Sequence, residues 1–111
     1  MLTPAFLLLA LVQSPTANVD TSRTAFTECL RREVRSSLEA KVTPADFTAA
    51  LPSKCDTTRK AFRAAIITAD RASGDSEAIA TENADMQIDD YHQSFADKFK
   101  DYSETNTLPA D

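Results

Sequence analysis

The sequence predicts an all-α protein: a small, disulfide-stapled bundle of three long helices and one short helix. Only one residue in 111 is Gly and five are Pro, too few turn residues for an all-β fold. Apolar residues make up 42% of the chain, which is too many for a disordered protein. Apolar side chains recur at helical spacing through most of the sequence, and two cysteines flank a short break in that pattern.

Residues 1–17 are typical of a signal peptide. Residues 4–12 read Pro-Ala-Phe-Leu-Leu-Leu-Ala-Leu-Val, and small and polar residues follow. This run is far shorter than the ~20 residues that span a bilayer. We expect cleavage after Ala17 and a periplasmic or secreted protein. No Lys or Arg precedes the run, and Pro15 lies in the cleavage region, so the alternative is a hydrophobic first helix that stays and packs.

The remaining chain is expected to form one helical domain, residues 18–103, with a flexible tail at 104–111. An exported chain with two cysteines has one intramolecular pairing, so a Cys29–Cys55 disulfide is predicted. A loop of about 25 residues closed in this way stabilises the fold by about 3–4 kcal/mol. A catalytic cysteine is disfavoured because neither Cys lies in a C-x-x-C motif and the single His is distant in sequence.

The first long helix is expected to start at a cap formed by Asp20, Thr21 or Ser22. Its apolar residues recur every four positions, so the stripe drifts by about 40° at each step. A stripe that winds in this way needs different packing partners at its two ends. It consists of Phe26, Leu30, Val34, Leu38 and Val42.

Thr43-Pro44 marks the start of a short helix, because Thr is a good N-cap and Pro suits the first helical position. The helix is expected to end near Leu51-Pro52, with Phe47, Ala50 and Leu51 facing inward. If the two sulfurs meet, residues 43–54 must run back antiparallel to the first helix. Cys55 then opens a third helix, which ends near Ser73-Gly74.

A fourth helix is predicted from Ser76 to Ser103. Its buried seam follows spacings of three and four and comprises Ala84, Ile88, Tyr91, Phe95, Phe99 and Tyr102. Ile79, Met86 and Gln93 lie seven apart on the opposite side. We consider them a possible contact for a partner protein, although two scattered exposed apolar residues are also normal on a soluble protein.

Charge divides unevenly between the two parts of the chain. Residues 18–73 hold ten Lys or Arg and seven Asp or Glu (+3), and residues 74–111 hold two and ten (−8). Either the acidic last helix lies on a mildly basic hairpin, or it offers an acidic surface to a cationic partner. No basic, aromatic-laced patch of the kind that binds nucleic acid is present.

The best candidate for chemistry is an acidic flank of the fourth helix. Glu82, Asp85, Asp89 and His92 are spaced to lie along one side, and carboxylates with a nearby His are typical metal ligands. The other helices offer only scattered acids and no second His, so we predict no metal site and no cofactor. No nucleophile triad or Gly-rich phosphate loop is found, and we expect no enzymatic activity.

From Cys29 to Tyr102 the layout resembles the small exported two-cysteine α-helical proteins of bacteria. The features in common are Cys29-Leu30, the Thr43-Pro44-Ala45-Asp46 start, and Cys55 heading an Ala-rich helix with Arg59 and Phe62. The resemblance implies the fold and export, and no activity or site residue. Our first hypothesis is a non-catalytic interaction module for an unidentified envelope protein. The alternatives are an acid-responsive periplasmic holdase, similar in size and architecture to acid chaperones, and a weak divalent-cation binder.

Overall fold

The computed structural model describes residues 14–109, and this part of the chain contains helices and no strand. Three long helices are present, α1 (Pro15–Glu39), α3 (Asp56–Ala72) and α4 (Glu77–Thr105), and one short helix, α2 (Pro44–Ala50). A 3₁₀ turn, η1 (Leu51–Ser53), follows α2. The predicted all-α class, with three long helices and one short one, is confirmed. Within residues 14–109, no helix is both long and apolar enough to cross a membrane.

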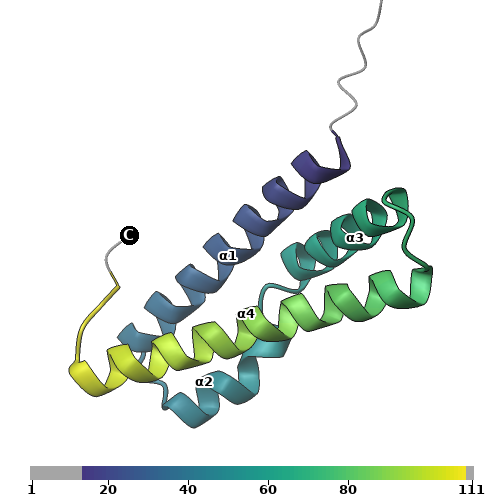
Figure 1. The fold of residues 1–111 in the computed structure, drawn as a ribbon. Helices are drawn as coiled ribbons and strands as arrows, with labels where there is room; N and C mark the ends of the chain where they lie inside the picture. Colours follow the sequence, from purple (N-terminus) through teal and green to yellow (C-terminus); the bar gives the residue numbers. More distant parts are fainter. Residues whose placement is uncertain (1–13, 110–111) are drawn as a thin grey trace, which may run out of the picture.

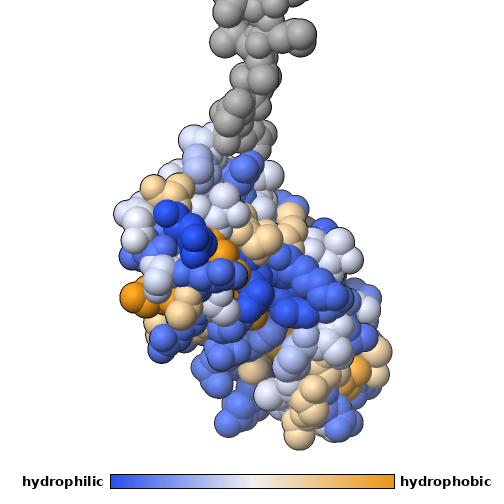
Figure 2. All heavy atoms as spheres, turned by 90° about the vertical axis from the view of Figure 1, so that its right-hand side faces the viewer, coloured by the Kyte–Doolittle hydropathy of each residue, from blue (hydrophilic) through white to orange (hydrophobic). Residues whose placement is uncertain are grey.

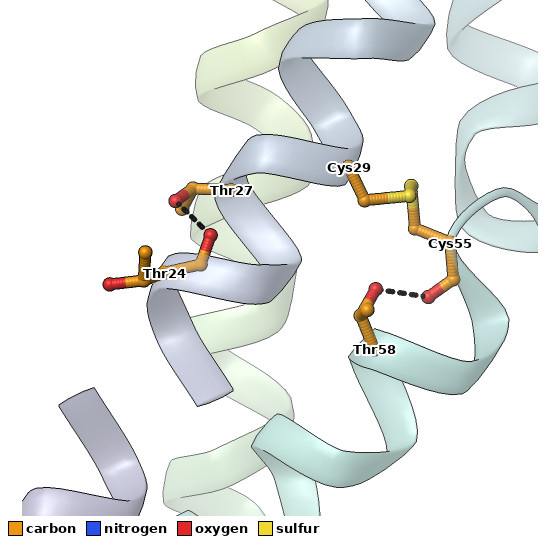
Figure 3. Close-up of a disulfide and its surroundings, with 5 residues drawn as sticks. All are labelled: Thr24, Thr27, Cys29, Cys55 and Thr58. Atoms are coloured by element: carbon orange, nitrogen blue, oxygen red, sulfur yellow. Dashed lines mark hydrogen bonds between the residues drawn. A yellow bond between two sulfur atoms is a disulfide. The ribbon is translucent and has the colours of Figure 1, made fainter. Parts of the chain in front are cut away.

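The Cys29–Cys55 disulfide is confirmed, with a Cα–Cα distance of 5.9 Å. Cys55 has a left-handed backbone (φ +57°), which turns the chain so that α3 begins directly after it. Thr58 supports this turn because its hydroxyl donates a hydrogen bond to the carbonyl of Cys55 at 3.0 Å (Figure 3). The link therefore holds the start of α3 against the middle of α1.

From that point α3 runs back along the amino-terminal half of α1, and α4 then returns beside α3 and passes the carboxyl-terminal end of α1 (Figure 1). The winding stripe of α1 meets different partners at its two ends, as predicted. Phe26 packs on Phe62 of α3, with ring centroids 5.8 Å apart, and on Tyr91 of α4 at 6.1 Å. Farther along, Val34 lies in the same hollow as Phe95 and Tyr102 of α4.

The path of α2 differs from the expected one. The return of the chain is as predicted, but α2 makes its main contacts with α4 and not along α1. The reason is the Phe47 ring, which stacks on Phe99 of α4 at 4.0 Å between centroids. Leu51 is buried beside it, whereas Ala50, which was expected to face inward, is exposed.

The predicted start of α1 is wrong. Asp20, Thr21 and Ser22 all lie inside the helix, and Ser14 is the N-cap, with its side-chain oxygen accepting a hydrogen bond from the Ala17 amide at 3.2 Å. Pro15 occupies the first turn, the same Ser/Thr-Pro arrangement that starts α2. Cleavage after Ala17 would remove this cap. Residues 1–13, and with them most of the predicted signal peptide, lie outside the described residues.

The other boundaries agree closely with the prediction. Thr43 caps α2, accepting from the Asp46 amide at 3.2 Å, and Gly74 takes the left-handed position (φ +103°) after α3. Ser76 caps α4. This helix continues to Thr105, so the first two residues of the predicted 104–111 tail are helical. The predicted seam of α4 is buried or partly buried throughout.

We predict that the Cys29→Ser, Cys55→Ser double variant loses about 3–4 kcal/mol of unfolding free energy, because the sequence separation of 26 sets the loop entropy that the disulfide removes. Urea denaturation of the oxidised wild type and the variant measures the difference. A Ser53→Ala variant, which alters an exposed neighbour and keeps the disulfide, is the control. A loss below about 1 kcal/mol would show that the link does not limit the unfolded chain.

Candidate functional site

The outer face of α4 carries the residues predicted to contact a partner. Ile79 is 56% exposed and Met86 is 55% exposed; with Leu108 they are the exposed large apolar residues of the described chain. Gln93 is also exposed, and its amide donates a hydrogen bond to Asp97 Oδ1 at 3.0 Å. The side chains of Ile79, Met86 and Gln93 thus follow one line along α4, and the Gln93 side chain is hydrogen-bonded within that helix.

The packing of α4 explains why this face is open. Ala80, Ala84 and Ile88 lie on the opposite side of the helix and are buried. Small alanines let α4 approach α3 closely, so the inner side is filled, whereas Ile79 and Met86 on the outer side remain exposed among the described residues. The end of the molecule where α3 and α4 meet shows separate hydrophobic groups in a mainly hydrophilic surface (Figure 2).

The acidic candidates occupy the same open surface. Glu82, Asp85 and Asp89 are all exposed. Asp85 Oδ1 accepts a hydrogen bond from Arg63 Nε of α3 at 2.8 Å, and this contact lowers the pKa of Asp85 below its usual value. Glu82 and Asp89 form no salt bridge within residues 14–109. Asp90, which the sequence analysis did not single out, is exposed beside them.

The structure does not gather these acids into a metal centre. Among the described residues, no three His, Cys, Asp or Glu side chains are grouped so that they could hold a metal ion. The exposed oxygens of Glu82 and Asp89 lie on a single helix, while Asp85 is engaged by Arg63. The cation-binder hypothesis therefore gains no support from the geometry.

The outer face is shallow. A hollow of about 540 Å³ is present there, and every residue that lines it belongs to α4: Ala78, Thr81, Glu82, Asp85, Met86, Asp89 and Asp90. A pocket for a small molecule usually has walls from more than one element, so that most of the ligand surface is buried. A surface formed by one helix alone suits a second helix laid against it.

His92 lies apart from the acids, at the edge of the core. Its ring is 6.0 Å from that of Phe26, and its Nε2 atom is buried without a hydrogen-bond partner in the described chain. Burial lowers the pKa of His92; the carboxylate of Asp89 opposes this shift, and the cation of Arg59 adds to it. His92 is therefore a core-edge group that resists protonation.

Arg59 was singled out in the sequence only as part of the resemblance, and it has a clear structural place. It forms a salt bridge with Asp56, and Asp56 also contacts Lys60 Nζ at 2.9 Å. These two cations lower the pKa of Asp56, with Lys60 the larger influence. The Nε atom of Arg59 is buried without a partner in the described chain, near His92. The i,i+3 spacing of Asp56 and Arg59 was the sequence signal for this pair.

Both cysteines of the chain are in the disulfide, so the protein as described has no free thiol to act as a nucleophile. No hydroxyl in the described chain hydrogen-bonds to His92, the only His in the sequence. The described residues thus offer surfaces for binding and no assembled group of the acid–base–nucleophile type.

We predict that the stability of the protein falls as pH decreases from about 7.5 to 5 and that His92 causes this slope. The folded-state pKa of His92 is lowered, so below about 6.5 the unfolded chain takes up the proton more readily, and unfolding is favoured. Above that pH both states hold neutral His, and the effect vanishes. Urea denaturation at several pH values measures it.

His92→Phe should remove this part of the pH dependence, because Phe can pack on Phe26 and does not titrate. A Gln93→Ala variant, altered at the exposed neighbour, should retain the wild-type slope. Parallel stability profiles for wild type and His92→Phe between pH 5 and 7.5 would show that His92 is not responsible.

No protein-family model, curated protein or solved structure matches this chain. The function is therefore argued from the surfaces that the fold presents.

Proposed function

We propose that this protein is a non-catalytic interaction module, and that the outer face of α4 binds a cationic amphipathic helix of an envelope protein. The observation that carries this proposal is the pattern of that face. Ile79 and Met86 are two turns apart and more than half exposed, and acidic residues fill the turns between and after them. A partner helix with apolar residues seven apart and Lys or Arg between them would be complementary in shape and charge.

A periplasmic or secreted location is part of the same proposal. The disulfide supports it, because such links persist in oxidising compartments, and so does the short apolar run at residues 4–12. The protein would then meet its partner outside the cytoplasm.

The size of the face indicates weak binding. Full burial of an aliphatic side chain contributes about 1.5–3 kcal/mol, so covering the exposed halves of Ile79 and Met86 gives about 2–3 kcal/mol in total. This is less than the ~4 kcal/mol that corresponds to millimolar affinity. The acids must therefore supply part of the binding, and salt should weaken it.

The charge balance between α3 and α4 shows which acids are available. Arg63 pairs with Asp85, and Arg71 Nη1 lies 3.8 Å from Glu77 Oε2. For Asp85 and Glu77, these pairs agree with the first explanation of the uneven charge, in which the acidic last helix lies on a mildly basic hairpin. Glu82, Asp89 and Asp90 are in no such pair within the described residues, and they support the explanation by a cationic partner.

We predict that a photo-crosslinking residue at Met86 traps one specific protein in living cells. Ile79→Glu should reduce the yield at least ~5-fold, since it places a charge in the apolar contact. Asp89→Asn with Asp90→Asn should reduce both the yield and its sensitivity to salt. Mass spectrometry of the adduct should map the contact to a basic helical segment.

The matched control carries the crosslinker at Thr48, an exposed residue of α2. Adducts of equal yield and identity from Thr48 and Met86, or adducts unchanged by Ile79→Glu, would contradict the proposed surface.

A second candidate, an acid-responsive holdase, is favoured by His92. Acid disfavours the folded state first through this half-buried imidazole, whose Nε2 atom is buried without a partner in the described chain. The ion pairs of Asp56 and Asp85 add stability above the unfolded-state pKa near 4 and lose it as pH falls further. At pH 3 most of the seventeen carboxylates are neutral and twelve Lys and Arg remain charged, which swells the fold.

For this candidate we predict loss of tertiary structure and suppression of client aggregation at pH 3, but not at pH 7. Near-UV circular dichroism and light scattering of an aggregating client protein measure the two effects. A protein that remains folded at pH 3 and leaves aggregation unchanged there is not an acid holdase.

A further inference from the structure

The segment after α4 folds back onto the helices. Asn106 has a left-handed backbone (φ +53°) and ends α4, and the Thr107 amide donates to the Tyr102 carbonyl at 3.2 Å. The carbonyl of Pro109 then accepts a hydrogen bond from Arg35 Nη2 of α1 at 3.1 Å. Figure 1 shows this segment returning from the end of α4 past α1. Residues 107–109 thus form a link between α4 and α1 in addition to the direct packing of these two helices.

These three residues lie in a groove between the carboxyl-terminal halves of α1 and α4. Two hollows with Tyr102 in common flank the segment. One, of about 670 Å³, includes Leu38, Val42 and Leu108. The other, of about 200 Å³, is lined by Arg31, Val34, Phe95, Lys98, Tyr102 and Pro109. Leu38, Val42 and Tyr102, which are partly buried, form the apolar part of this lining, and Val34 is buried beneath it.

The topology leaves this groove without a helix to cover it. The disulfide starts α3 at the level of Cys29, so α3 covers only the earlier half of α1, and α2 packs on α4. From Val34 to Leu38 the wall runs about 6 Å along α1, at 1.5 Å per residue, and Val42 lies past the end of the helix. An extended chain advances about 3.3 Å per residue, so the helical part of the wall holds about two residues.

The chain's own segment fills the groove only in part. Leu108 remains 53% exposed, and Pro109 is partly buried. The end of the groove next to Pro109 is basic: Arg31 and Lys98 line it, and Arg35 holds the Pro109 carbonyl. In the sequence, Pro109 is followed by Ala110 and the acidic Asp111. Leu108 and Pro109 therefore lie against the apolar wall, and the basic end is complementary in charge to an acidic residue of a ligand.

We propose that the groove between α1 and α4 is a peptide-binding site, covered at rest by residues 107–109. Its ligand is an extended segment of another protein in which leucine and proline precede an acidic residue. This site is separate from the outer face of α4, which is acidic and suits a cationic helix. The two surfaces therefore bind partners of opposite charge, and one can fail without the other.

The test uses the full-length oxidised protein and a fluorescein-labelled peptide, Thr-Asn-Thr-Leu-Pro-Ala-Asp, with binding measured by anisotropy. In the double variant Leu108→Gly, Pro109→Gly the internal competitor is weakened. We expect this variant to bind the peptide at least ~10-fold more tightly than the wild type, because a tethered competitor acts at millimolar effective concentration. The matched peptide Thr-Asn-Thr-Gly-Gly-Ala-Asp should not bind.

Adding Arg35→Gln to the double variant should weaken binding at least ~5-fold, whereas adding Lys54→Gln, an exposed cation of the α2–α3 connection, should not. In the wild type, NMR titration with excess peptide should shift the signals of Val34 and Tyr102, which gives a second measurement that needs no variant. Equal affinity of wild type and double variant, binding of the glycine peptide, or no shift at Val34 and Tyr102 would overturn the proposal.

Discussion

The covalent link between Cys29 and Cys55 controls how the four helices pack against one another. It fixes the first residue of α3 beside the middle of α1, so α3 can cover only the earlier half of that helix. The short α2 must fit within the connection and packs on α4 through Phe47. The disulfide therefore determines that three helices pack around the core near Phe26.

The consequence is an uneven distribution of packing along α1 and α4. Around Phe26 three helices meet, and aromatic rings from α1, α3 and α4 contact one another. Around Val34 and Leu38 the described neighbours come from α1 and α4, from Pro44 at the start of α2, and from residues 107–109. The less protected half is where a further peptide can be accommodated.

Helix α4 serves two purposes because its two sides differ. Its inner seam supplies buried residues along most of the core, from Ala80 to Phe99. Its outer side keeps acids, part of which neutralise Arg63 and Arg71 of α3, while Glu82, Asp89 and Asp90 face outward. The described core has no fully buried polar residue, and Arg59 and His92 lie partly buried at its edge. Burial lowers the pKa of His92, so this residue couples the packing of the core edge to pH.

The amino-acid sequence was enough to predict the helical class, the disulfide, the cap at Thr43 and the seam of α4, because these depend on local spacing and residue chemistry. It also placed Ile79 and Met86 on the outside. Three contacts were not predicted: α2 packs on α4, Arg63 engages Asp85, and residues 107–109 return to Arg35. Those contacts join residues far apart in the chain, so no local pattern specifies them. The start of α1 was missed although Ser14-Pro15 carries a local signal, because that signal overlaps the apolar segment assigned to export.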